Sequence, residues 1–512
     1  MTMSTQSPVS LEKLVNGLRR GDAYSHEVAE PVVVHQTHIS VVFLAGEFAY
    51  KIKKPIKTDF LDYSTLGLRK HYCQEELRLD SRYSSDLYLR VVPITFDGER
   101  IEVDGEGETV EYAVMMRRFS EGALLSERIE SHHMTTNEVF RLAETVATVH
   151  QSANVGHDSI AEQWPDFLVR NVHEIIETLQ RDATPSDATS SEAATLKVLH
   201  DWSNEFFRDH LDLLSQRIEG GFIRSCHGDL HLANVVHWNG ELIPFDGIEF
   251  NEHLQWIDVL SDAAFLAMDF AARGHLDLSR SFMNAYLEQT GDYGSLDLMR
   301  LFLFYRSLVR GLAASMRGDQ QDRKQHIELA YRFTLRESPR LWITHGFSGS
   351  GKTTLSEAVV QRHEAFRLRS DIERKRLFGL SPTDRPSADV RSKMYDSDSN
   401  ERTYSRLTEI ASDVLHAGYS VIIDATFLKQ GDRQRSHDLA QRKGVPLAIL
   451  DCHSDPQTLR QRIADRIQRD DDASDADLDV LDHQISHHEP LTDVERSFVV
   501  DVPDVVQIAD RL

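Results

Sequence analysis

The sequence predicts an α+β part followed by an α/β part, and three observations along its 512 residues support this prediction. Residues from about 31 to 118 alternate between apolar and polar types as strands do, with one helical stretch among them. Residues from about 135 to 335 repeat apolar positions at helical spacing. After residue 340, short apolar runs alternate with helical stretches, which is typical of a parallel sheet covered on both faces.

The composition limits the partners that the chain is expected to have. Its 57 Lys and Arg stand against 82 Asp and Glu, for a formal net charge of -25. Nucleic-acid binding needs cationic groups against phosphates, so we expect a small-molecule substrate; the oligomeric state stays open. The sequence shows no apolar run near the ~20 residues of a membrane span and no secretory signal at its start. Cys73, Cys226 and Cys452 lie far apart without CxxC spacing, which favours a reducing, cytoplasmic location.

The first part is expected to begin with a β-hairpin. The runs "VVFL" (41–44) and "FAYKIKK" (48–54) are joined by a turn that contains Gly46. A helix is predicted over 64–83, and strands return over 87–103 and 111–119. These elements predict an antiparallel sheet with one helix.

The stretch "HGDLHLANVVHWNGELIPFD" (227–246) contains the first group of candidate catalytic residues. Its histidines do not follow a zinc-ligand spacing, and a core loop with hydrogen-bonded histidines is the structural alternative. Phosphoryl transfer to an alcohol explains more of the residues, because it needs a base and oxygen ligands for magnesium. Asp229 is the candidate base, and Asn234 and Asp246 are the candidate ligands. Two short strands joined by "HWNG" would bring these ligands together.

HGDLHxxN followed by an apolar strand and an aspartate resembles the aminoglycoside and choline phosphotransferases, which share the protein-kinase-like fold. The resemblance implies a bilobal domain over 31–337, after an N-terminal extension of residues 1–30. Its N-lobe would cover about 31–118 and its helical C-lobe about 119–337. The resemblance also implies the roles given to Asp229, Asn234 and Asp246, and it suggests that Asp258 and Asp262 brace the catalytic loop.

Such a kinase needs a lysine on its third strand and a glutamate on the next helix. Lys51 in "FAYK" is the candidate lysine, with Lys53 on the same strand face as its rival. Glu75 and Glu76 are both candidates for the glutamate. A solvated basic cluster is the alternative for "KIKKPIK", and no GxGxxG is present for the phosphates. Met116 lies in "VMMRRF", which resembles the hinge that receives adenine.

The second part carries "GFSGSGKTT" (346–354), which matches the P-loop pattern GxxxxGKT. An apolar strand precedes it and a helix follows it, so the glycines would let backbone N–H groups face phosphates at a helix N-terminus. Lys352 would reach the β- and γ-phosphates and Thr353 would hold magnesium. The predicted nucleotide-binding residues of this loop are Gly346, Ser348, Gly349, Ser350, Gly351, Lys352, Thr353 and Thr354.

The remainder of the second part resembles small P-loop kinases such as gluconate kinase, polynucleotide kinase and the zeta-toxin kinases. This resemblance makes Asp371 a catalytic base, although a helix N-cap is the alternative. Asp424 would support magnesium, and Arg462 and Arg466 would lie on a lid helix over the phosphates. The alternative for this helix is a basic face that is simply exposed to solvent. Strand candidates at 341–345, 366–370, 419–424, 446–452 and 505–510 predict a parallel five-stranded sheet in a domain over 338–512.

The whole chain resembles bacterial proteins that join an aminoglycoside-phosphotransferase-like domain to a P-loop kinase domain. We therefore expect ATP and Mg²⁺ as cofactors and transfer of the γ-phosphate, in both domains, to a hydroxyl of a sugar, aminosugar, aminoglycoside-like molecule or nucleoside. In one alternative the first domain is a regulatory pseudokinase and only the P-loop domain is active, on a small molecule or a polynucleotide 5′-hydroxyl. In another, the chain is a nucleotide-gated binding module.

Overall fold

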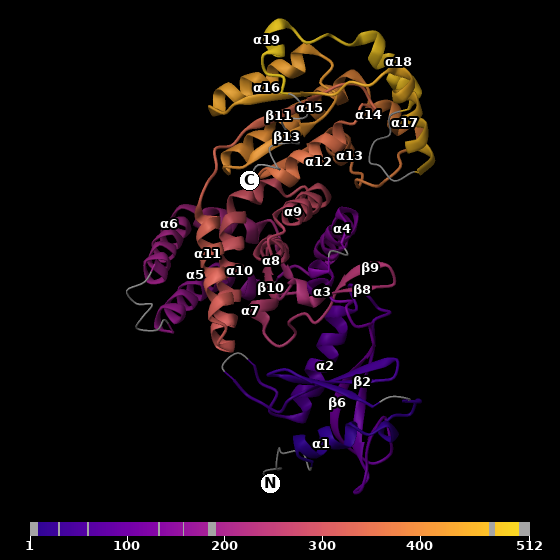
Figure 1. The fold of residues 1–512 in the computed structure, drawn as a ribbon, viewed down its shortest axis with the longest axis vertical. Coiled ribbons are helices and arrows are strands. Elements are labelled where there is room, and N and C mark those ends of the chain that lie inside the picture. The colour runs from indigo at the N-terminus through magenta and orange to yellow at the C-terminus, as the bar shows by residue number, and fades with distance from the viewer. Residues whose placement is uncertain are drawn as a thin grey trace. The chain divides into compact units, whose positions relative to one another are not determined.

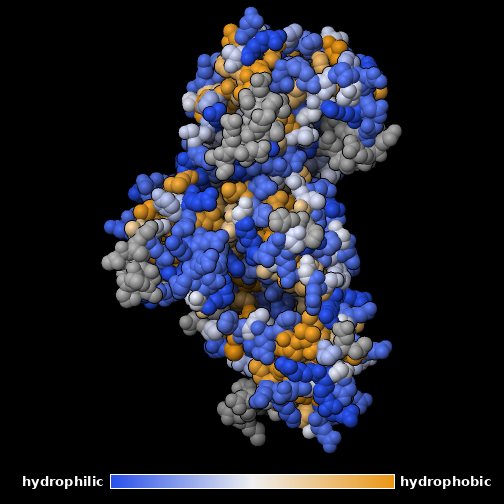
Figure 2. All heavy atoms as spheres, viewed as in Figure 1, coloured by the Kyte–Doolittle hydropathy of each residue, from blue (hydrophilic) through white to orange (hydrophobic). Residues whose placement is uncertain are grey.

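The computed structural model describes residues 9–28, 31–58, 61–131, 134–156, 158–182, 191–469 and 477–500. The chain divides into two compact units. Unit 1 comprises residues 1–171 and 207–266, and unit 2 comprises residues 172–206 and 267–512. Within the described ranges, no helix combines the length and the apolar character that a membrane crossing requires. On the face drawn in Figure 2, hydrophilic side chains predominate and apolar ones are scattered.

Unit 1 begins with an antiparallel six-stranded sheet in the order β1-β2-β3-β6-β4-β5. Its strands are β1 (Val33–Gln36), β2 (Ser40–Ala45), β3 (Phe48–Lys53), β4 (Tyr88–Phe96), β5 (Ile101–Val103) and β6 (Glu108–Arg117). The predicted hairpin is confirmed, since β2 pairs with β3 across a turn in which Gly46 has a φ of 59°. A positive φ suits glycine because it has no Cβ.

Each face of this sheet is covered by one helix. Helix α1 (Leu11–Leu18) buries Leu14, Val15 and Leu18 in the apolar cluster on one face. Helix α2 (Leu66–Asp80), which confirms the predicted helix, packs against β4 and β6 on the other face. Because α2 buries charged residues along with Cys73, its packing already points to an ion-pair network.

The rest of unit 1 holds short strand pairs among helices (Figure 1). The helices are α3 (Leu125–Glu130), α4 (Thr136–Ser152), parts of α5 (Asp158–Arg181) and α6 (Ser191–Glu219), α7 (Glu252–Gln255) and the start of α8 (Val259–Ala272). Strand β7 (Ile223–Ser225) pairs with β10 (Trp256–Asp258), and β8 (Val235–Trp238) pairs with β9 (Glu241–Pro244). Asn239 and Gly240, with φ of 50° and 88°, form the tight turn predicted between β8 and β9.

Unit 2 contains a parallel sheet in the order β12-β13-β11-β14. Its strands are β11 (Leu341–His345), β12 (Ala365–Arg369), β13 (Ser420–Asp424) and β14 (Leu447–Asp451). Four of the five predicted strands are thus confirmed, and the described residues form a four-stranded sheet instead of the five-stranded one expected. The fifth candidate, 505–510, lies outside the described residues, and before it only a parallel bridge joins Val499 to Ile449.

The helices of unit 2 after residue 275 are all labelled in Figure 1. They are α9 (Leu276–Thr290), α10 (Leu296–Arg317), α11 (Gln320–Thr334), α12 (Lys352–Arg362), α13 (Ser370–Leu377), α14 (Ala388–Met394), α15 (Ser397–His416), α16 (Gln430–Lys443), α17 (Pro456–Arg469), α18 (Leu478–His487) and α19 (Asp493–Arg496). Helix α9 covers the edge strand β12. The Asn284 amide donates to the Ala365 carbonyl at 3.1 Å and accepts from the Arg367 N–H at 2.7 Å. An exposed strand edge is a liability, and here a side chain supplies the missing hydrogen bonds.

Candidate active sites

The first candidate site is built around a buried lysine of β3. Lys51 forms an ion pair with Glu76 of α2, with 2.9 Å between Nζ and Oε1, and a second one with Asp246. Glu76 is fully buried, whereas Glu75 faces the surface and pairs with Arg78 at 2.7 Å. Of the two glutamates left open by the sequence, the structure therefore places Glu76 against Lys51.

At Lys51 and Glu76, the charges of neighbouring groups outweigh the effect of burial on the pKa. Burial opposes the charged form of Lys51, but the carboxylates of Asp246 and Glu76 outweigh it and raise the pKa of the ammonium. Burial likewise opposes the charge on Glu76, yet the two ammonium groups of Lys51 and Lys53 lower its pKa to about 2. Lys51 and Glu76 are therefore both charged at neutral pH.

Lys53, the rival lysine, is also buried and belongs to the same network. Its Nζ lies 2.8 Å from the second oxygen of Glu76 and also bonds Glu249, which accepts from the Tyr63 hydroxyl. Both lysines point toward α2 because residues two apart share a strand face. Glu249 was missed by the sequence analysis, and its only signal was its position three residues after Asp246.

The predicted base and one predicted metal ligand lie together in the loop after β7. The Asn234 amide donates to the backbone oxygen of Asp229 at 3.0 Å and to its carboxylate at 3.2 Å. The Asp229 side chain is 37 % exposed, so a substrate can reach it. Nε2 of His231 lies 3.4 Å from the same carboxylate. The loop thus presents a reachable carboxylate whose orientation is fixed by its neighbours.

This loop is braced from behind by Asp262, as the resemblance suggested. Its carboxylate accepts the backbone N–H groups of His227 and Gly228, both at 2.9 Å, and lies 3.1 Å from Nε2 of His150. With Cys226, His150 and Asp262 form a cluster with metal-ligand chemistry, but these hydrogen bonds already give the carboxylate a structural role. Asp258 instead forms a buried ion pair with Arg217 at 2.7 Å.

His227 is buried next to the loop. Burial lowers the pKa of its imidazole, against the opposing charge of Asp262, so the ring is neutral at pH 7. A neutral ring has one donor, and Nε2 lies 2.9 Å from the Phe245 carbonyl. This bond ties the loop after β7 to the residue before Asp246.

Asp246 follows β9 in a left-handed conformation with a φ of 63°. This conformation costs a non-glycine residue about 1 kcal/mol, although aspartate tolerates it better than most. The Tyr88 hydroxyl accepts its backbone N–H at 3.0 Å and stabilises the turn. Met116, the predicted hinge residue, lies near the end of β6, in register with Ala49 of β3 and Tyr88 of β4.

The second candidate site is the loop before α12 in unit 2. Gly346, Gly349 and Gly351 have φ of 141°, 80° and 92°. A Cβ on Gly346 would lie 2.3 Å from the carbonyl oxygen of Cys452, so only glycine fits there. Ser348 and Ser350 are buried in the loop, whereas Thr354 is exposed. The loop geometry thus depends on backbone conformations that other residues rarely adopt.

The charged residues of this site contact the loop or its helix. Nζ of Lys352 donates to the Phe347 carbonyl at 2.7 Å. Buried Asp424, at the end of β13, accepts from Ser356 of α12 at 3.1 Å. Arg367 of β12 approaches the Thr353 carbonyl at 3.5 Å. The predicted magnesium residues Thr353 and Asp424 therefore lie on adjoining elements, the start of α12 and the end of β13.

Asp371 lies in the first turn of α13, and its side chain is 26 % exposed. The N-cap position belongs to Arg369, so the N-cap alternative for Asp371 is not realised. Nη1 of Arg374 lies 3.9 Å from its carboxylate. Arg374 is itself buried, bonds Asn400 at 2.8 Å and lies over the Tyr395 ring. A carboxylate next to a fixed guanidinium suits a base that meets a charged substrate.

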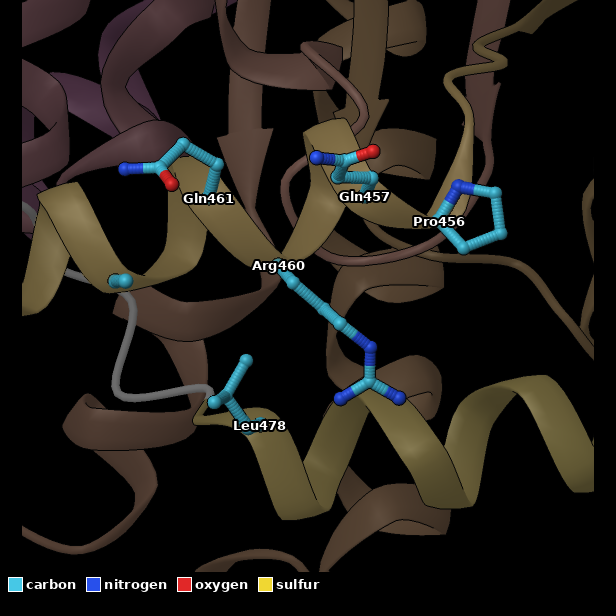
Figure 3. Close-up of a pocket in the computed structure, with 6 residues that line it drawn as sticks. Pro456, Gln457, Arg460, Gln461 and Leu478 are labelled. Atoms are coloured by element: carbon cyan, nitrogen blue, oxygen red, sulfur yellow. The ribbon is translucent and has the colours of Figure 1, made fainter.

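Helix α17 contributes Arg462, whose Nη1 donates to the Gly349 carbonyl at 3.1 Å and lies 3.3 Å from Ser454. Arg466 lies on the same helix, but its side chain is outside the described residues. An open groove of about 510 Å³ runs along α17 and α18 (Figure 3). Its lining comprises Pro456, Gln457, Arg460, Gln461, Ala464 and Leu478. No predicted nucleotide-binding residue is among them, so this groove is separate from the candidate site.

Parts of the chain are similar to known proteins. Residues 341–491 match the family model described as AAA domain. An uncharacterised protein of Mycobacterium tuberculosis (strain ATCC 25618 / H37Rv) is 28 % identical over 462 residues, which are 89 % of this chain and 90 % of that protein. The family match and the loop geometry together confirm the predicted P-loop domain.

Two solved structures have partial similarity. A choline/ethanolamine kinase family protein from Mesorhizobium loti is 12 % identical, with a TM-score of 0.35, over 60 % of this chain and 94 % of that one. A sugar kinase from Janibacter sp. HTCC2649 is 20 % identical, with a TM-score of 0.25, over 33 % of this chain and 92 % of that one.

Proposed function

We propose that the chain is an ATP-dependent phosphotransferase with two sites, each of which transfers the γ-phosphate of ATP to a hydroxyl of a small molecule. The observation that carries this proposal is the ion pair of Lys51 with both Glu76 and Asp246, residues up to 195 positions apart. Buried charges are costly unless they are paired, and here the lysines and carboxylates pair with one another. Phosphoryl transfer needs this set of residue types near a reachable carboxylate, which Asp229 supplies.

In the unit 1 site, Asp229 acts as the base. Its carboxylate accepts the proton of the substrate hydroxyl while the hydroxyl oxygen forms a bond to the γ-phosphorus. The bond from that phosphorus to the oxygen bridging the β-phosphate breaks, and ADP leaves with the electron pair. Lys51 holds the nucleotide phosphates, Glu76 orients Lys51, and the strand end at Met116 receives the adenine. Asn234 fixes the Asp229 carboxylate through its amide nitrogen.

The residues near Asp229 also fit magnesium. Asn234 and Asp246 offer amide and carboxylate oxygens, the ligand atoms that Mg²⁺ prefers. The nitrogen of the Asn234 amide already donates to Asp229, so its oxygen is the ligand atom. Asp246 is 44 % exposed, which leaves room for an ion beside its contact with Lys51. When bound, magnesium would neutralise part of the phosphate charge.

In the unit 2 site, the loop of residues 346–354 holds the phosphates with its backbone N–H groups and with Lys352. Asp371 accepts the proton of the second substrate hydroxyl, and the same bonds form and break as in unit 1. Arg462 and Arg466 stabilise the phosphate charge. Thr353 and Asp424 offer oxygen atoms to magnesium on two adjoining elements. The three cysteines are buried and form no disulfide within the described residues, in agreement with a reducing compartment.

The experiment that tests both assignments uses the full chain with Asp229→Asn or Asp371→Asn. Each protein is incubated with ATP, magnesium and a panel of sugars, aminosugars, aminoglycosides and nucleosides, and phosphorylated products are detected by mass. We expect each substitution to reduce its own product at least about a hundredfold, within the contribution of a general base. Each variant is the control for the other, because both change one carboxylate to an amide of the same shape.

The remaining outcomes separate the alternatives. If every product depends on Asp371 alone, unit 1 is a regulatory pseudokinase. A 5′-hydroxyl oligonucleotide is tested as a further acceptor. If labelled phosphate is transferred to it alone, the P-loop part is a polynucleotide kinase. If no product forms and ATP turnover is unchanged in both variants, the two-kinase proposal fails and a nucleotide-gated binding module replaces it.

A further inference from the structure

A side chain of α18 holds the P-loop of unit 2 through two hydrogen bonds. The amide oxygen of Gln484 accepts the backbone N–H of Ser348 at 2.9 Å. The amide nitrogen of Gln484 lies 3.1 Å from the Ser348 hydroxyl oxygen and donates to it. A backbone N–H can only donate, so the orientation of the amide is fixed by this pair. Glutamine suits the position because one planar group offers both an acceptor and a donor.

Apolar contacts hold α18 in place for this bond. Leu481, one helical turn before Gln484, is fully buried against Leu459 and Ile463 of α17. Phe347, the residue before Ser348, packs on the same cluster and lies edge-on to the His488 ring at 5.2 Å. Residues three apart share a helix face, so Leu481 anchors the face from which Gln484 reaches the loop.

The loop is held from a second side at the next residue. Arg462 of α17 donates to the Gly349 carbonyl at 3.1 Å. A Cβ on Gly349 would lie 3.0 Å from the Leu459 carbonyl, so the loop backbone and α17 are in close contact there. Two helices thus hold two successive residues, Ser348 and Gly349, in a loop whose glycines leave it conformationally free.

We propose that Gln484 is a positioning residue for nucleotide binding, which holds the Ser348 peptide so that the phosphate cradle of residues 346–354 is formed before the nucleotide arrives. This inference rests on the proposed function of the P-loop. Ordering a flexible loop on binding costs affinity, and a loop that is already ordered avoids that cost. Loss of Gln484 therefore weakens nucleotide affinity although Gln484 need not touch the nucleotide.

The test measures nucleotide affinity of the full chain by titration calorimetry, with Mg·ADP and with a non-hydrolysable Mg·ATP analogue. Lys352→Ala identifies the binding event that belongs to the P-loop, because that event disappears in this variant. For the same event, Gln484→Ala is expected to raise Kd about threefold to tenfold, the effect of losing one or two hydrogen bonds. Ile485→Ala is the control, since Ile485 is the next residue on the same helix and its side chain is exposed.

Gln484→Glu separates positioning from a general loss of structure, because it keeps the side-chain size and still accepts the Ser348 N–H. It adds a negative charge near the phosphates, so Kd should rise more for the ATP analogue than for ADP, and added salt should reduce the difference. A merely structural role would lower the melting temperature of both Gln484 variants equally and would not distinguish the two nucleotides.

The outcomes are distinct for the inference and for its premise. If Lys352→Ala leaves all nucleotide binding unchanged, the proposed function of the P-loop fails. If Lys352→Ala abolishes one binding event while Gln484→Ala and Gln484→Glu bind both nucleotides within twofold of the parent, the positioning role of Gln484 is refuted and the P-loop assignment stands.

Discussion

The two candidate sites are built in opposite ways. In unit 1, side chains from β3, α2 and the segment after β9 meet in one network of charged groups. Lys51, Lys53, Glu76 and Glu249 are buried in it, and Asp246 lies at its exposed edge. In unit 2, one continuous backbone loop forms the site, and its shape depends on glycines with positive φ. The first site depends on charge balance between distant segments, and the second depends on local backbone geometry. Substitutions in the unit 1 site should therefore lower the stability of the fold, whereas substitutions in the unit 2 site should mainly weaken ligand binding.

The largest expected effect is at Glu76, because its carboxylate balances two buried lysines. Replacing Glu76 with Gln leaves Lys51 and Lys53 with fewer counter-charges in a dry environment. Removing one partner from a buried ion pair costs roughly 3–5 kcal/mol of unfolding free energy. Urea unfolding followed by the fluorescence of unit 1 tryptophans measures this loss. Unchanged stability would mean that the network is solvated and that the comparison of the two sites is wrong.

Low pH should destabilise the same network of charges without any mutation, because it protonates Glu76. The Lys51 and Lys53 ammonium groups outweigh the effect of burial and lower the pKa of Glu76 to about 2, below its ordinary 4.5. A carboxylate with a lowered pKa contributes stability that is fully present above the ordinary pKa and is lost as pH falls toward the lowered one. We therefore expect the parent chain to lose stability between pH 4.5 and 2 more steeply than Glu76→Gln. Parallel slopes in urea unfolding across this range would contradict the charge assignment.

The pair of Lys53 with Glu249 tests whether the network is cooperative. Lys53→Met and Glu249→Leu should each destabilise unit 1, because each leaves a buried charge without its partner. The double variant replaces the pair with apolar side chains and should recover at least about 2 kcal/mol relative to the sum of the single changes. A double-mutant cycle in urea measures the coupling. Additive losses would show that Glu76 and Tyr63 satisfy the two groups independently.

A backbone change should break the unit 2 site at a smaller cost in stability. Gly346→Ala introduces a Cβ at 2.3 Å from the Cys452 carbonyl at a φ of 141°. We expect nucleotide binding at the P-loop to be lost and the unfolding free energy to fall by about 1–3 kcal/mol. Gly431→Ala is the control, since its Cβ would meet no atom within 4 Å and it lies in α16. Retained nucleotide binding in Gly346→Ala would show that the loop tolerates a shifted backbone.

The same contrast explains how much the sequence could predict. The P-loop lies within nine consecutive residues, so its pattern and the flanking strand and helix identified it without a structure. The parallel strands of unit 2 were also predicted, because each is a short apolar run with a clear break on either side. Glu76 could not be chosen over Glu75, since helix periodicity alone does not say which neighbour faces the sheet. Glu249 and Gln484 act across tertiary contacts, and their partners are far from them in the sequence.

The smallest expected effect is at Glu75, and it makes the choice between the two glutamates measurable. Glu75 pairs with Arg78 one turn later on α2, and both side chains are partly exposed. Exposed pairs at this helical spacing contribute less than about 0.5 kcal/mol, so Glu75→Gln should leave urea unfolding and every product of the chain nearly unchanged. Glu76→Gln makes the same chemical change one residue away, and the two variants differ only in which face of α2 loses its charge. If Glu75→Gln instead reduced the product that depends on Asp229, Lys51 would exchange partners during the reaction, and the buried pair would describe only one state of the site.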